Sequence, residues 1–222
     1  MIRPSATGNT KNIDHLIKNP EIFEKKFFLQ KGDLADITSL FKIVSEVSPD
    51  EIYNEADQDH VLWSFSIPDY SYDITGAAVG RILEVIRQVN PKIKFFQPCS
   101  SNMFGKALQT PQTENTPFNP QSPYACAKVL AYMLARHYRT AYGIFACTAI
   151  FYNHESPRRT EEYVTRKITK AAARISLGLQ EKLLLGDLDA KIDWGYAKEY
   201  MEAAWNIMQL EKADDFIIST GE

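Results

Sequence analysis

Tyr124 and Lys128 are the first residues in this sequence whose types and spacing could do chemistry. They lie four positions apart in a segment predicted to be helical, so they share one helix face. A lysine ammonium beside a phenol favours the phenolate and lowers the pKa of the tyrosine. The tyrosine then becomes a usable acid or base near neutral pH. The same spacing recurs at Tyr163 and Lys167, where a surface pair is the usual interpretation.

A serine distinguishes the first pair from the second. Ser100 follows a β-rich apolar run at 94–98 and precedes Tyr124 by 24 residues. Ligands of open parallel sheets bind beyond the carboxyl ends of the strands, where this serine is expected. Its hydroxyl could hydrogen-bond a substrate hydroxyl or carbonyl while Tyr124 moves its proton. The sequence therefore predicts Ser100, Tyr124 and Lys128 as one catalytic group.

The elements that must position this group alternate between short β-rich runs and longer amphipathic segments. Strands are predicted at 26–30, 51–54, 94–98, 144–151, 183–185 and 216–219, and helices at 37–47, 69–89, 124–142, 161–177 and 197–210. Four prolines between residues 109 and 123 predict an irregular loop. The alternation predicts an α/β fold, a doubly wound parallel sheet with helices on both faces.

Composition excludes several classes of function. The chain has 222 residues, and its net charge of −3 with scattered basic residues shows no nucleic-acid surface. No apolar run approaches the roughly 18 residues of a membrane span, and no signal-peptide core is visible, so we expect a cytoplasmic protein. The odd cysteine count, without CxxC spacing, argues against disulfides and zinc and predicts buried reduced thiols at Cys99, Cys126 and Cys147. No metal site is expected, and the three tryptophans are predicted to lie in or near the core.

Longer motifs surround the catalytic group. The segments SSNMFG at 100–105, TPF at 116–118 and SPYACAK at 122–128 resemble the extended short-chain dehydrogenase/reductases. Three more segments narrow the resemblance: NHESPRR at 153–159, VTRKIT at 164–169 and DWGYAK at 193–198. Together they resemble the GDP-mannose 4,6-dehydratases, and the resemblance covers essentially all 222 residues.

The resemblance implies a reaction and the partners for it. Enzymes of this family use tightly bound NADP without net consumption: hydride leaves C4 of the mannose, water is eliminated across C5–C6, and hydride returns to C6. The tyrosine at Tyr124 takes the 4-hydroxyl proton beside the cofactor, and the lysine at Lys128 holds the nicotinamide ribose. The resemblance also implies GDP-mannose or a related nucleotide sugar as ligand, and a homo-oligomer paired through the helix bearing Tyr124.

Binding residues are implied in the same way. Arg3 matches an arginine suited to the 2′-phosphate of NADP, and Asp33 matches an acidic residue near the adenine. His154 is also assigned to the cofactor. Asn153 and Lys167 match positions that contact the GDP part of the substrate, which makes Lys167 a diphosphate ligand rather than a second catalytic lysine.

The sequence departs from the family pattern at the site. A strand and a Gly-x-x-Gly-x-x-Gly turn, expected ahead of Arg3, have no counterpart, so we expect an incomplete NAD(P)-binding Rossmann fold without its first strand and glycine-rich loop. Asn102 stands where the family has the glutamate that removes the C5 proton. The run 55–60 carries three carboxylates that would repel cofactor phosphates. Ile192 replaces an arginine that meets the substrate diphosphate.

These observations leave the domain division and the activity as expectations. Residues 1–152 are expected to form an incomplete dinucleotide-binding domain, and residues 153–222 a partial substrate-binding region with returning Rossmann elements. Three functions remain open: a working GDP-mannose 4,6-dehydratase or its fragment, an impaired relative that binds nucleotide sugar or serves as a partner subunit, and a reductase or epimerase. The last needs the tyrosine and lysine but no glutamate.

Overall fold

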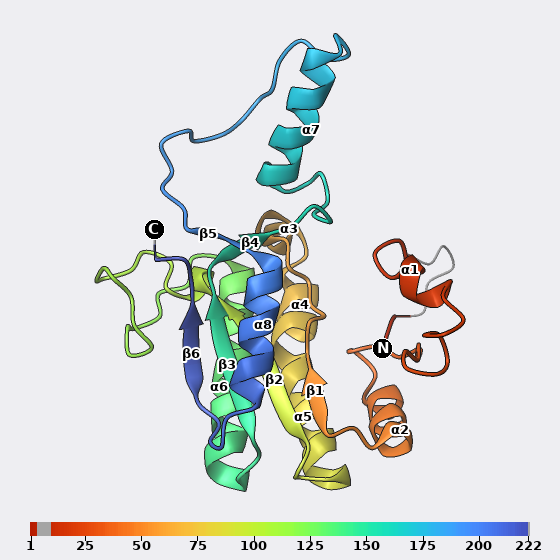
Figure 1. The fold of residues 1–222 in the computed structure, drawn as a ribbon. Coiled ribbons are helices and arrows are strands. Elements are labelled where there is room, and N and C mark those ends of the chain that lie inside the picture. Colours follow the sequence, from red (N-terminus) through yellow and green to blue (C-terminus); the bar gives the residue numbers. More distant parts are fainter. Residues whose placement is uncertain (4–9, 222) are drawn as a thin grey trace.

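The computed structural model describes residues 1–3 and 10–221 and has a parallel sheet at its centre (Figure 1). The main sheet has the strand order β1-β2-β3-β6, formed by Glu51–Tyr53, Lys94–Ser100, Ala146–Phe151 and Asp215–Ile218. All of its pairings are parallel. A second parallel pair joins β4, Asn153–Glu155, to β5, Trp194–Tyr196. The predicted α/β fold with a parallel sheet is confirmed.

Helices cover both faces of the main sheet. On one face lie α2 (Ile37–Val47), α5 (Ala78–Val89) and α6 (Pro123–Tyr142), and on the other lies α8 (Ala197–Met208). Because side chains alternate along a strand, Phe95 of β2 joins the core with α5 while the adjacent Phe96 joins the core with α8. Two separate hydrophobic layers therefore hold β2 and β3 in the middle of the molecule.

The remaining helices are short, apart from α7 (Val164–Ser176). They are α1 (Asp14–Ile17), α3 (Val61–Ser66), α4 (Pro68–Ser71), a π-helical turn over Tyr72–Ala77 and a 3₁₀ turn over Ser101–Met103. The predicted helix at 69–89 thus consists of α4, the π turn and α5. No helix within residues 1–3 and 10–221 is both long enough and apolar enough to cross a membrane.

Two predicted strands are wrong. The segment 26–30 forms no strand, and the only pairings near it are the isolated bridges Ile2–Lys31 and Phe23–Phe27. The segment 183–185 also lacks a strand partner and runs through exposed chain, where Leu184 is 69% exposed. Both segments have apolar composition, but a strand forms only where a neighbouring edge is available for backbone pairing.

Some burial predictions are wrong as well. Cys99 and Cys147 are buried, whereas Cys126 is exposed because it lies on the outer face of α6. The three tryptophans are also exposed, at 54%, 44% and 57% for Trp63, Trp194 and Trp205. All three cysteines are free thiols, as expected.

Local sequence determines where α6 begins and ends, and α6 carries the predicted catalytic pair, Tyr124 and Lys128. The Ser122 side chain accepts a hydrogen bond from the Ala125 N–H at 3.1 Å, and Pro123 occupies the first helical position. The helix ends at Gly143, whose φ of 67° suits a residue without a β-carbon. Gly76 lets the π turn approach closely, since a β-carbon there would lie 3.2 Å from the Ala127 carbonyl oxygen.

A buried polar network ties β6 to α6. The Asp215 carboxylate, whose side chain is 7% exposed, accepts hydrogen bonds from Arg139 at 2.7 Å, Thr148 at 2.7 Å and Tyr132 at 3.2 Å. Arg139 also donates to the Ala146 carbonyl at 2.8 Å. Every partner of this carboxylate comes from α6 or β3, so one side chain joins three elements.

Two features lie at the margins of the sheet. Among the described residues β1 pairs only with β2, which makes it an outer strand of the main sheet. The helix α7 stands away from the main sheet on two irregular connections (Figure 1). Of all its residues, each of which is described, only Ala171 is buried.

The elements α8 and β6 come from the second predicted domain, yet α8 packs on β3 and β6 pairs with it. The division at residue 152 stays a prediction.

Candidate functional site

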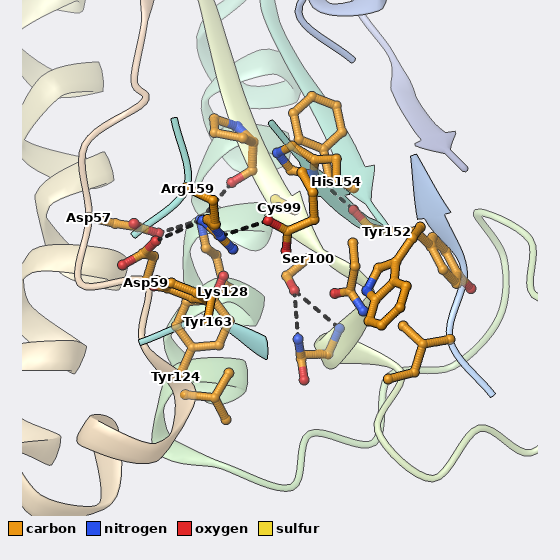
Figure 2. A pocket seen from close by; sticks show the side chains of 18 of the residues that line it. Asp57, Asp59, Cys99, Ser100, Tyr124, Lys128, Tyr152, His154, Arg159 and Tyr163 are labelled. Atoms are coloured by element: carbon orange, nitrogen blue, oxygen red, sulfur yellow. Dashed lines mark hydrogen bonds and ion pairs between the residues drawn. The ribbon is translucent and has the colours of Figure 1, made fainter. Parts of the chain in front are cut away.

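A cavity of about 330 Å³ opens beyond the carboxyl ends of β1, β2 and β3. Its lining includes all three residues of the predicted catalytic group, Ser100, Tyr124 and Lys128 (Figure 2). Ser100 is the last residue of β2, and the other two lie in the first turns of α6. The structure therefore brings together the three side chains that the sequence predicted as one group.

Ser100 is oriented by Asn102, the residue that the resemblance predicts at the position of the family glutamate. Its hydroxyl oxygen accepts hydrogen bonds from the Asn102 backbone N–H at 3.2 Å and from the Asn102 side-chain amide at 3.1 Å. A hydroxyl has two acceptor lone pairs and one donor hydrogen. With both lone pairs in use, Ser100 is left as a donor toward Tyr124 or a ligand oxygen.

Lys128 is buried and forms an ion pair with a carboxylate. Its ammonium lies 2.6 Å from the Asp57 carboxylate and donates to the Pro98 carbonyl at 2.9 Å. Burial lowers the pKa of Lys128, but the Asp57 carboxylate, together with Tyr124 and Cys99, holds that pKa above its ordinary value. Lys128 is therefore a permanent cation whose nearest charged partner is a carboxylate of this chain.

Tyr124 is a weaker acid than an ordinary tyrosine. Burial raises the pKa of Tyr124 to about 12, and the Asp57 carboxylate also raises it. The Lys128 ammonium and a hydrogen bond from Ser100 lower the pKa, as the sequence analysis expected of the lysine, but these two effects are smaller. Tyr124 in this chain is therefore not the acid or base near neutral pH that the sequence predicted.

We expect Tyr124 to remain protonated through pH 10. Its pKa in the folded chain exceeds the ordinary value of about 10, so the phenol favours the folded state below pH 10, and this contribution is lost as pH rises through about 12. Carbon NMR of a chain with labelled tyrosine ring carbons would follow the ionisation, with Tyr124→Phe assigning the signal. A Tyr124 midpoint below 9 would contradict the prediction.

A second charged group in the cavity lining is centred on Arg159. Arg159 contacts the Glu155 carboxylate at 3.0 Å and the Asp59 carboxylate at 3.8 Å. Its guanidinium lies over the Tyr163 ring, 3.5 Å from the centroid. Sequence reasoning weighed Tyr163 only as a partner of Lys167 and did not place it in the site. The many charged residues in 55–60 and 155–159 are the sequence pattern that could have predicted this group.

His154 is held by packing and by one hydrogen bond. Its Nδ1 lies 2.9 Å from the Tyr152 carbonyl oxygen, and its ring stacks on Tyr200 with centroids 4.6 Å apart. Burial lowers the pKa of His154 below its ordinary value. The residue lines the cavity as a neutral ring. Its assignment to the cofactor stays a prediction.

The other predicted binding residues are distributed unevenly. Asn153 lines the cavity, as does Ile192. The Lys167 ammonium instead donates to the Leu184 carbonyl at 2.7 Å, outside the lining. Arg3 donates to the Tyr70 hydroxyl at 2.7 Å, and Asp33 accepts from the Ala35 N–H at 3.0 Å, so neither reaches the cavity. Their roles remain predictions.

The charge of the cavity does not fit an anionic dinucleotide. Both cations in the lining already lie beside carboxylates, and the acidic residues outnumber them: Glu55, Asp57, Asp59 and Glu155 face Lys128 and Arg159. A pyrophosphate needs unpaired donors, and like charges at short range repel. Within residues 1–3 and 10–221, no three His, Cys, Asp or Glu side chains gather as metal ligands would.

Comparison with known proteins identifies the family. The family model for GDP-mannose 4,6 dehydratase matches residues 1–222. The chain is 45% identical to the GDP-mannose 4,6-dehydratase of Yersinia enterocolitica over 222 residues, which is 99% of this chain and 60% of the relative. The chain belongs to the GDP-mannose 4,6-dehydratase family. It spans about 60% of the length of that curated relative.

Solved structures agree with the fold of this dehydratase-family chain. RMD from Pseudomonas aeruginosa, complexed with NADPH, matches with a TM-score of 0.81 at 23% identity over 87% of this chain and 67% of that one. A UDP-N-acetylglucosamine 4-epimerase from Methanobrevibacter ruminantium, in complex with UDP-N-acetylmuramic acid, matches with a TM-score of 0.83 at 23% identity, covering 98% and 67%. At this identity the likeness establishes the fold alone.

Proposed function

We propose that this chain is a catalytically impaired member of the GDP-mannose 4,6-dehydratase family that binds a nucleotide sugar, with GDP-mannose as the first candidate, and does not dehydrate it. The observation that carries the proposal is Asn102, whose amide donates to Ser100 at the position of the family glutamate. An amide neither accepts the C5 proton nor delivers a proton to the departing hydroxyl at neutral pH.

The state of the catalytic pair supports the same proposal. Tyr124 holds its proton to about pH 12, so it is a poor base for a sugar hydroxyl. Lys128 is paired with Asp57 at 2.6 Å, which reduces the positive field that the phenolate would need. The hydroxyls of Ser100 and Tyr124 remain suited to hydrogen bonding with the mannose, and we propose that the anionic diphosphate of the ligand lies outside this acidic lining, toward Lys167.

Binding and turnover measured on one preparation test the proposal. We expect GDP-mannose to bind in isothermal titration, while chromatography of a long incubation with NADP shows no GDP-4-keto-6-deoxy-mannose. Ser100→Ala should weaken binding, since a buried hydrogen bond is worth about 1 kcal/mol. Formation of the keto product would overturn the impaired assignment, and absence of any GDP-mannose binding would overturn the binding function.

Restoring the family residue should not restore activity. We expect Asn102→Glu to leave turnover of GDP-mannose undetectable, because Lys128 and Tyr124 still lie in an acidic cavity. Product formation over hours, measured by chromatography with the Asn102→Gln variant as control, checks this. Turnover by Asn102→Glu alone would show that one side chain accounts for the impairment.

The cofactor and the compartment belong to the same proposal. NADP is what the family resemblance implies, but the acidic lining of the cavity is unfavourable to it, so we propose that this chain binds NADP weakly or not at all. Free thiols at Cys99, Cys126 and Cys147 suit a reducing compartment, and we propose a cytoplasmic location.

We propose that the chain pairs with a second copy through α6 and the adjacent α3. These helices contact one another and expose large apolar side chains: Leu62 and Phe65 at 72% and 59%, and Leu130 and Met133 at 42% and 48%. An exposed apolar patch of this kind marks an interaction surface.

Sedimentation velocity distinguishes the possibilities for this surface. We expect a dimer for the unmodified chain and a monomer for Leu130→Asp, because burying a carboxylate at an interface is costly. Leu108→Asp serves as the matched control, since Leu108 is 78% exposed in the proline-rich loop, and it should remain dimeric. A monomeric unmodified chain would contradict the proposal.

A further inference from the structure

Asp57 and Lys128 form the most enclosed ion pair in the cavity. Their side chains are 15% and 5% exposed, and the Asp57 oxygen lies 2.6 Å from the lysine nitrogen. Asp57 is in the irregular chain after β1, whereas Lys128 is on α6, so the pair joins two elements across the cavity floor. Figure 2 shows Asp57 and Asp59 on the same side of the lysine.

The pair uses most of the donors of Lys128. An ammonium has three N–H groups. In Lys128, one of them contacts Asp57 and a second donates to the Pro98 carbonyl, so one remains. One N–H beside a carboxylate suits a neutral hydroxyl, which can accept from the lysine and donate to Asp57. A phosphate oxygen cannot donate, and it would meet the negative charge of Asp57 at short range.

The neighbouring charges do not offset this arrangement. The other cation in the lining, Arg159, lies 3.0 Å from Glu155 and 3.8 Å from Asp59. Glu55 adds a further carboxylate to the lining. The cavity therefore has no cation free of a carboxylate partner among the described residues that line it.

We propose that Asp57 closes this cavity to a nicotinamide dinucleotide, because its carboxylate pairs with the Lys128 ammonium and repels the anionic pyrophosphate, and leaves the cavity open to an uncharged polyhydroxy group. Asp57 is thus a specificity-determining residue. Asp57 determines the charge of the ligands that the cavity accepts. This effect does not depend on whether the chain binds GDP-mannose. Failure of the sugar-binding proposal and failure of this one are therefore separate results.

Titration of NADPH at low ionic strength, followed by its fluorescence, tests the proposal. Asp57→Asn keeps the size of the side chain and releases the lysine charge. We expect the variant to bind NADPH at least 10-fold more tightly than the unmodified chain, and added salt should weaken that binding. Asp50→Asn is the matched control: it removes one exposed carboxylate outside the cavity and should leave the affinity unchanged.

Equal affinities for the unmodified chain and Asp57→Asn, including no detectable binding by either, would overturn the proposal. An equal gain in Asp50→Asn would also overturn it, because the effect would then be one of net charge. The unmodified chain provides a test that needs no variant: half-saturation by NADPH at or below about 10 μM would show that Asp57 does not exclude the dinucleotide. Circular dichroism of each variant verifies folding, and Asp57→Ser replaces Asp57→Asn if the amide variant does not fold.

Discussion

Asp215→Ala is expected to lower the free energy of unfolding by about 3–5 kcal/mol. The substitution removes the carboxylate that accepts from Arg139, Thr148 and Tyr132. Arg139 is only 15% exposed, so its guanidinium would remain inside the protein without a counter-charge. The loss in free energy of unfolding comes mainly from this buried, unpaired cation rather than from the lost hydrogen bonds.

Urea denaturation followed by circular dichroism measures this effect. The neighbouring Asp214→Asn is the control, since Asp214 is exposed and its side-chain oxygen accepts from the Asp215 N–H, at 2.9 Å. We expect a change of at most about 0.5 kcal/mol for this variant. A loss below about 1 kcal/mol for Asp215→Ala would mean that water solvates Arg139 when its partner is removed.

Lys128→Met is the second substitution with a large expected effect, a loss of about 3 kcal/mol or more. Methionine fills much of the lysine volume but leaves Asp57 without its cation and removes one of the two donors to the Pro98 carbonyl, which keeps the Gln97 side-chain amide. The exposed pair Lys42–Glu46 provides the comparison: its side chains are 71% and 58% exposed, and Lys42→Met should cost at most about 0.5 kcal/mol.

A double-mutant cycle separates the ion pair from packing. Asp57→Asn combined with Lys128→Met removes both charges, so we expect the double variant to be more stable than Lys128→Met alone, with a coupling of about 1–3 kcal/mol. Urea midpoints of the four chains give the coupling directly. Additive losses would mean that water screens Asp57 from Lys128 and that the 2.6 Å contact contributes little.

Elements with local signals were predictable from the sequence. Asp36 marks the start of α2, where its carboxylate accepts from the Thr38 and Ser39 N–H groups, and Gly143 marks the end of α6. β2 was expected to end at Pro98 and continues to Ser100, because β3 pairs with it that far. These elements depend on neighbouring residues in sequence, which is what pattern reasoning captures.

Elements that depend on distant partners were not predictable in this way. β4 and β5 are three residues each, and their paired residues are 41 positions apart, as Asn153 and Trp194 are, so neither strand has a recognisable pattern of its own. The segments 26–30 and 183–185 have the composition of strands but no edge to join. Strand formation in such short runs is decided by tertiary context.

The candidate site shows the same limit. Ser100, Tyr124 and Lys128 line one cavity, as motif and strand order predicted, while their catalytic role stays a prediction. The acidic run at 55–60 was expected to be unfavourable to phosphate, but no pattern indicated that Asp57 would contact Lys128. That contact depends on the path of irregular chain after β1, which only the structure provides.

Because of its position, α7 is under weaker packing constraints than the core layers around β2 and β3. Because α7 buries only Ala171 and is attached through irregular segments at both ends, substitutions along it leave the two core layers around β2 and β3 undisturbed. Evolutionary drift can therefore alter α7 without loss of the fold, while the strands that carry Ser100 and the helix that carries Tyr124 are held by packing. If a lineage lost the reaction, the elements that carry Ser100 and Tyr124 would change last, because they stabilise the fold.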